Sequence, residues 1–62
     1  MFKENLKQYR KERNLSQREL ALEINVSIPT IGHWESGYTE PGIMHIKKLA
    51  KYFGVTTDEL LD

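Results

Sequence analysis

The chain has 62 residues with nine basic and nine acidic side chains, so its formal net charge is zero, and it contains no cysteine for a disulfide or a thiolate metal site. We expect residues 1–62 to form one domain, which at this length buries only about 60% of its unfolded surface and leaves little room for a catalytic cleft. The charged first ten residues lack an apolar run of about seven residues, so we expect neither a signal peptide nor a membrane span, and the lack of cysteine suits a reducing cytoplasm.

The basic side chains are unevenly distributed along the chain. Residues 1–18 contain six basic and two acidic side chains, a net charge of +4, and no Lys or Arg then occurs before Lys47. The middle of the chain therefore has no permanent cation with which to attract a polyanion. Because the net charge is zero, the protein as a whole also produces no strong electrostatic field that would attract a nucleic acid.

Apolar residues at helical spacing predict a first helix, which ends near Arg13 and Asn14. Its apolar positions are Phe2, Leu6 and Tyr9. A second helix, over residues 17–24, is predicted by a capping box, in which Ser16 accepts a backbone N–H and Glu19 reaches back to the start of the helix. Its apolar stripe consists of Leu20, Ala21 and Ile24.

Only three residues separate this helix from the next predicted one. Asn25 tolerates the left-handed conformation that ends a helix, and Ser27 can cap the helix that follows. Ala21 is small enough to let the next helix approach closely, and Pro29 is tolerated in a first helical turn, where an N–H has no partner to lose. The spacing therefore predicts a tight helix–turn–helix.

The helix predicted over residues 28–36 has two different faces. At about 100° per residue, Ile31 and Trp34 lie on the side that can close a core. The other face spans about 140° and consists of Ile28, Pro29, Gly32, His33 and Ser36. This second face is left for a partner outside the domain.

The rest of the sequence predicts a loop and further helices. The loop covers residues 37–41, and Gly42 can open the next helix, which Gly54 ends. The apolar stripe of that helix consists of Ile43, Ile46, Leu49, Ala50 and Phe53. A second capping box, Thr56 with Glu59, begins a last short helix. No strand pattern occurs, so the predicted fold class is all-α, a compact bundle of four or five short helices.

Four stretches of the sequence resemble the phage-repressor type of helix-turn-helix domain, the Cro/C1 or XRE family. They are SQRELA at 16–21, VSIPTIGHWESG at 26–37, Pro41, and KLAKYFGVTTDELL at 48–61. The resemblance covers most of the chain and implies a lambda-repressor-like fold. It also implies a sequence-specific transcriptional regulator, expected to be a repressor, that binds double-stranded DNA with its recognition helix, about residues 28–36, in the major groove.

The resemblance assigns base reading to the open face of that helix, at Ile28, Pro29, Gly32 and His33. The first two can contact thymine methyl groups, and His33 can hydrogen-bond a purine N7 or a guanine O6. Family members often carry Gln, Asn, Lys or Arg at these positions. Each residue also has an alternative interpretation without a role in base reading. Ile28 then folds onto the core, Pro29 simply starts the helix, Gly32 simply eases packing, and His33 is a solvated polar residue.

Further positions match family residues that approach the DNA backbone. They are Gln17, Ser27, Trp34, Ser36, Tyr38, Gly42 and Ile43. Gln17 stands at a helix N-terminus, whose N–H groups favour binding of a phosphate. The alternative interpretation is that Gln17 is an exposed first residue of the helix and makes no DNA contact. Trp34 is expected to lie mainly in the core. Arg10 and Glu35 match a partly buried ion pair that ties the first helix to the recognition helix.

One such module reads only a few base pairs, so we expect a homodimer on a pseudo-palindromic operator with half-sites about 34 Å apart. The exposed candidates for the dimer interface are Val55, Leu60 and Leu61 on the last helical turn. The alternative for these three residues is closure of the domain's own core.

The competing hypothesis is a protein-interaction or antitoxin-like module on the same fold, in which exposed Ile28 and Pro29 bind protein. The cation-free helix and the zero net charge favour it. We do not expect an enzyme, a cofactor or a metal site, because the sequence has no Cys, no Gly-rich phosphate loop and no cluster of His and carboxylates.

Overall fold

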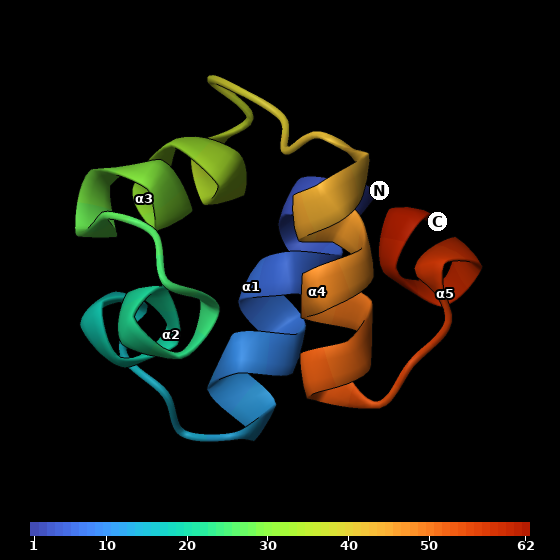
Figure 1. The fold of residues 1–62 in the computed structure, drawn as a ribbon, viewed down its shortest axis with the longest axis horizontal. Helices are drawn as coiled ribbons and strands as arrows, with labels where there is room; N and C mark the ends of the chain where they lie inside the picture. Colours follow the sequence, from blue (N-terminus) through green and yellow to red (C-terminus); the bar gives the residue numbers. More distant parts are fainter.

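A computed structural model of residues 1–62 contains five α-helices and no strand, which confirms the all-α prediction (Figure 1). The helices are α1 (Phe2–Glu12), α2 (Gln17–Ile24), α3 (Ile28–Ser36), α4 (Ile43–Phe53) and α5 (Thr57–Leu61). In Figure 1, α2 and α3 form one side of the molecule and α5 the other, with α1 and α4 between them. None of the five helices has the length and hydropathy that crossing a membrane requires.

The first four helices end in the same way. Each is followed by a residue in the left-handed conformation, and these residues are Asn14, Asn25, Gly37 and Gly54, with φ between 57° and 82°. The next N–H then bonds back across the turn at 2.9–3.1 Å, from Leu15 to Arg10, from Val26 to Ala21, from Tyr38 to His33, and from Val55 to Ala50. This Schellman arrangement satisfies carbonyls at each helix end and reverses the chain within a few residues.

The helix starts follow the predicted caps. Both capping boxes are present, Ser16 with Glu19 and Thr56 with Glu59, each with reciprocal hydrogen bonds of 2.8 and 3.0 Å. At the start of α3, Ser27 Oγ accepts the N–H of Thr30 at 3.2 Å. Gly42 precedes α4 without any side-chain cap. Three of the five helices therefore begin at a local sequence signal.

The hydrophobic core draws on all five helices. Its fully buried large side chains are Leu6, Leu20, Ile24, Ile31, Leu49 and Leu60, and Ala21, Trp34, Ile46, Ala50 and Phe53 complete it. Within the predicted stripe of α4, Ile43 is the exception, because it lies at the start of the helix and is 64% exposed. The helix–turn–helix is thus anchored through Leu20, Ala21 and Ile24 on α2 and through Ile31 and Trp34 on α3.

The expectation that Leu60 is exposed for a dimer interface is wrong. Leu60 is fully buried in the domain's own core, because α5 is only five residues long and needs this side chain to pack it against its neighbours. Asn5 on α1 also holds α5, since its Nδ2 donates to the carbonyl of Leu60 at 3.0 Å. Val55 is half-buried and packs against the core, so Leu61, at 45% exposure, is the most accessible of the three.

Candidate nucleic-acid interface

Helix α3 has the two faces that its sequence predicts. Ile31 and Trp34 are buried, whereas Ile28 is 43% exposed and Pro29 and His33 also lie at the surface. Buried anchors on one side therefore hold a helix whose other side is open to solvent.

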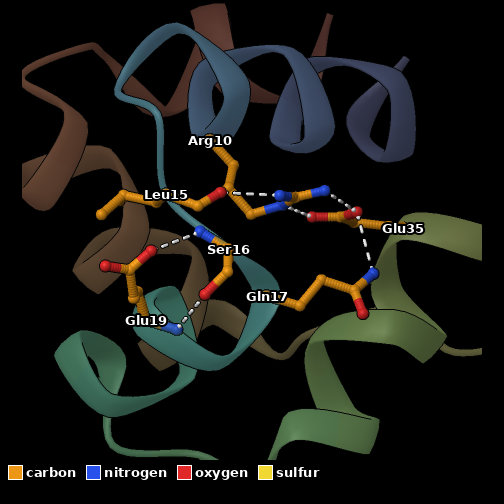
Figure 2. A network of polar contacts seen from close by, with 6 residues as sticks. All are labelled: Arg10, Leu15, Ser16, Gln17, Glu19 and Glu35. Carbon is orange, nitrogen blue, oxygen red and sulfur yellow. Dashed lines mark hydrogen bonds and ion pairs between the residues drawn. The ribbon is translucent and has the colours of Figure 1, made fainter.

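An ion pair between Arg10 on α1 and Glu35 on α3 fixes this helix (Figure 2). Arg10 Nε donates to Glu35 Oε2 at 2.6 Å and Nη2 donates to Oε1 at 3.0 Å, so the guanidinium binds the carboxylate through two parallel hydrogen bonds. Arg10 Nη1 also donates to the carbonyl of Leu15 at 2.7 Å. Hydrogen bonding to Glu35 raises the pKa of Arg10, although burial opposes this effect.

Gln17, at the first position of α2, joins the same network. Its Nε2 donates to Glu35 Oε1 at 3.2 Å, so Glu35 connects α1, α2 and α3 (Figure 2). The amide lies beside Gly32, where an added Cβ would be 3.8 Å from Gln17 Oε1. Its second N–H and its oxygen make no bond within the protein, which leaves both able to bind a ligand.

The two serines expected near the DNA backbone hold the ends of α3. The Ser27 hydroxyl, besides capping the helix, lies 2.7 Å from Thr30 Oγ1. Ser36 Oγ donates to the carbonyl of His33 at 3.1 Å and accepts the N–H of Tyr38 at 3.3 Å. Both hydroxyls therefore already have protein partners, although both residues lie at the surface.

The other expected backbone contacts lie in or near the loop between α3 and α4. Tyr38 is 77% exposed, and its hydroxyl makes no hydrogen bond within the protein. Trp34 packs its ring against His45, with centroids 5.4 Å apart, and His45 is half-buried. No buried side-chain nitrogen lacks a partner, so the unbonded indole N–H of Trp34 reaches the surface. Gly42 and Ile43 are exposed at the start of α4.

Comparison with known proteins gives the family. Residues 6–60 match the family model described as helix-turn-helix. The chain belongs to the helix-turn-helix family of the Cro/C1, or XRE, type.

Several relatives of this helix-turn-helix chain are named as regulators. It is 45% identical to the HTH-type transcriptional activator BcrR of Enterococcus faecalis, over 97% of this chain and 29% of that protein. It is 38% identical to the cryptic phage CTXphi transcriptional repressor RstR of Vibrio cholerae, over 98% of this chain and 55% of the repressor. The chain thus spans about half or less of the length of these two proteins.

A solved structure shares the helix-turn-helix fold. The master regulator for biofilm formation SinR, in a crystal structure in complex with DNA, superposes with a TM-score of 0.89 at 33% identity, and the match covers 100% of both chains. This agreement extends over all five helices and confirms the lambda-repressor-like fold expected from the sequence.

One basic residue beside the end of α3, Lys3, was not predicted from the sequence as part of this site. A Cβ on Gly37, at the end of α3, would lie 3.0 Å from Lys3 Cδ and 3.4 Å from Lys3 Nζ, so Lys3 of α1 lies against this turn. Glycine suits this position because its φ is +82°, and a Cβ there would also make the flexible Lys3 side chain shift slightly. The pair is separated by 34 positions, and no local pattern marks it.

No group of three or more His, Cys, Asp or Glu is placed to hold a metal ion.

Proposed function

We propose that residues 1–62 form a sequence-specific double-stranded DNA-binding domain that regulates transcription, with α3 in the major groove. The observation that carries this proposal is the construction of α3: its inner face is buried, Glu35 ties it to α1 and α2, and its outer face is open. A rigid helix with one open face can enter a groove without rearrangement. The SinR structure, which has the same fold, is a complex with DNA, and this supports DNA binding by the present chain.

Base reading is proposed for the outer face of α3. Ile28 and Pro29 present apolar surface to thymine methyl groups, and His33 donates or accepts a hydrogen bond at a purine edge. Gly32 has no side chain, so the helix backbone can come closer to the bases there. None of these residues carries a permanent charge, so sequence preference depends on shape and hydrogen bonding rather than on cations.

Phosphate contacts are proposed around this face. Gln17 has a free N–H on its amide, and the backbone N–H groups of Gln17 and Arg18 have no protein partner at the start of α2. Tyr38 offers a free hydroxyl, and Lys3 adds a cation beside the same loop. The remaining contacts are proposed for Ser27, Trp34, Ser36, Gly42 and Ile43.

We further propose that two copies bind one operator. A two-fold pair places its recognition helices about 34 Å apart, one helical turn of DNA, and reads a pseudo-palindrome. Leu61 with the exposed part of Val55 forms the proposed contact between the copies. Repression is the proposed outcome, supported by the match to RstR, and the proposed location is the cytoplasm.

A second candidate function is a protein-interaction module. The apolar character of exposed Ile28 and Pro29 and the absence of Lys and Arg from α3 favour it. In that case the outer face of α3 binds a protein and has no affinity for DNA.

A mobility shift with random duplex DNA at low salt separates the two candidates. Wild-type chain is expected to bind, and Ile28→Glu is expected to abolish binding, because a carboxylate on α3 would face the phosphates and bases. Leu22→Glu is the matched control, since Leu22 is also an exposed aliphatic residue, on α2, and this variant retains most of the binding. If the wild type binds no duplex at all, the DNA proposal is wrong and the protein-interaction module is favoured.

A further inference from the structure

The proposed base-reading histidine lies against a second aromatic ring. The ring centroids of His33 and Tyr38 are 4.9 Å apart and their planes are tilted by 54°. His33 belongs to α3, and Tyr38 to the loop that follows it. Both side chains are exposed, so this contact lies on the surface of the domain.

The backbone holds Tyr38 in this place. Its N–H donates to the carbonyl of His33 at 2.9 Å, across the left-handed turn at Gly37. Ser36 Oγ bridges the same two residues, since it donates to the His33 carbonyl and accepts the N–H of Tyr38. These bonds fix the backbone of Tyr38 relative to His33, so the ring needs only one of its side-chain rotamers to lie against the imidazole.

The other three Schellman turns show what this position normally does. The residues equivalent to Tyr38 are Leu15, Val26 and Val55, and all three are partly buried aliphatic side chains packed against the core. Tyr38 differs from them because it is 77% exposed and its partner is a polar side chain. The contact between Tyr38 and His33 therefore closes no core, and its consequence lies at the surface.

We propose that Tyr38 is a positioning residue that holds the imidazole of His33 in its base-reading orientation, and so sets specificity at the base pair that His33 contacts. This inference rests on the proposed function. An exposed histidine on a helix samples several staggered rotamers, and a ring beside it removes some of them. Less freedom is then lost when the imidazole meets its base. A phosphate contact by the Tyr38 hydroxyl would instead act equally on every sequence.

The test measures a discrimination ratio, the dissociation constant for a duplex with one base pair changed divided by that for the selected duplex. His33→Ala identifies the base pair concerned. Tyr38→Ala is expected to lower the ratio by about three- to tenfold at that base pair and at no other. Tyr38→Phe keeps the ring and therefore keeps the ratio. In the His33→Ala background, Tyr38→Ala is expected to change the ratio no further, because the two residues act as a unit.

Two controls accompany these single and double variants of His33 and Tyr38. Thr39→Ala, on the same exposed loop, is expected to retain the ratio. Without DNA, the NMR signals of the His33 ring protons are expected to carry a ring-current shift from Tyr38 that disappears in Tyr38→Ala. Unchanged signals in that variant would overturn the inference even where no duplex is available.

Other results would also contradict the proposal. If Tyr38→Ala weakens all duplexes equally and leaves the ratio intact, Tyr38 contacts only the DNA backbone. If it lowers the ratio equally with and without His33, it acts independently of the imidazole. A wild type that selects no duplex means that the proposed function has failed, and this inference fails with it, whereas failure of the inference alone leaves selection by the wild type intact.

Discussion

Arg10 and Glu35 form a two-point ion pair in which the side chains are only 10% and 4% exposed. The pair joins α1 to α3, and Gln17 brings the start of α2 to the same carboxylate. Such a pair defines geometry more than it adds net stability, because both charges lose water when they are buried. Removing one partner leaves the other charge stranded.

Arg10→Ala is therefore expected to destabilise the fold strongly. Loss of the guanidinium leaves Glu35 buried and ionised, and we expect the free energy of unfolding to fall by about 2 to 4 kcal/mol. Urea denaturation measures this change. The double variant Arg10→Ala/Glu35→Ala is expected to lose less than the sum of the two single variants, because the stranded charge is then absent.

Lys7→Ala is the appropriate control for this series. Lys7 is exposed on the same helix and makes no hydrogen bond or ion pair, so its removal is expected to change stability by less than about 0.5 kcal/mol. Arg13 is not a neutral reference, because its Nη2 donates to the carbonyl of Phe53 at 3.0 Å and its guanidinium lies over the ring of Tyr52. Equal denaturation midpoints for Arg10→Ala and Lys7→Ala would show that the pair is only a surface contact.

The capping box of α2 gives the fold a dependence on pH. The hydrogen bond from the Ser16 backbone lowers the pKa of Glu19, with a further contribution from the Ser16 side chain. A lowered folded pKa means that the ionised carboxylate stabilises the fold. This contribution is complete above the unfolded pKa of about 4.3 and is lost as pH falls through the lower folded value.

Glu19→Gln keeps the acceptor oxygen and removes the charge, so its melting temperature is expected to fall less steeply than that of the wild type as pH drops below about 4.3. Thermal unfolding across this range measures the difference. Glu23→Gln, on the same helix, is the control and is expected to keep the wild-type dependence. Identical profiles for Glu19→Gln and the wild type would show that the capping charge does not contribute.

Gly32→Ala is expected to raise stability and weaken DNA binding. An added Cβ would lie 3.8 Å from Gln17, an ordinary contact, and alanine in a helix interior is favoured over glycine by about 0.5 to 1 kcal/mol. The same methyl group would stand between the backbone of α3 and the bases. Melting temperature and duplex affinity are measured on the same preparation. An increase in stability with unchanged affinity would mean that Gly32 only eases packing.

His33→Ala and Gln17→Ala are expected to affect DNA binding differently. His33→Ala should lose about 1 to 3 kcal/mol on the selected duplex, with much less change on random DNA, because a base contact acts on one sequence. Gln17→Ala should weaken both duplexes alike, because a phosphate contact acts on all of them. Titration of each variant against both duplexes measures this. If His33→Ala weakens both equally, Ile28 and Pro29 carry the specificity.

Local chemistry explains which parts of the fold the sequence predicts. The two capping boxes, the Ser27 cap, and the left-handed turns at Asn25 and Gly54 each depend on residues within five positions of one another, and all are present. The two faces of α3 follow from helical spacing alone. The end of the first helix near Asn14 is predicted as well, and the left-handed conformation of Asn14 has the same chemical basis as that of Asn25.

The remaining features depend on tertiary packing. Lys3 against Gly37 and Arg13 on the Phe53 carbonyl join positions more than thirty residues apart, and no spacing rule links them. The sequence leaves Leu60 open between a dimer interface and the domain's own core, because a five-residue helix is too short for a stripe to show which of two adjacent leucines turns inward.

Sequence-specific DNA binding by α3 is tested by selection of bound duplexes from a random pool. We expect enrichment of a pseudo-palindrome with half-sites about 34 Å apart, one helical turn, bound by two copies of the chain. Leu61→Asp, which places a charge in the proposed contact between copies, is expected to enrich single half-sites, whereas Leu22→Asp, at an exposed leucine on α2, keeps the full site. A pool that shows no enrichment after selection with the wild type would contradict sequence-specific DNA binding by α3.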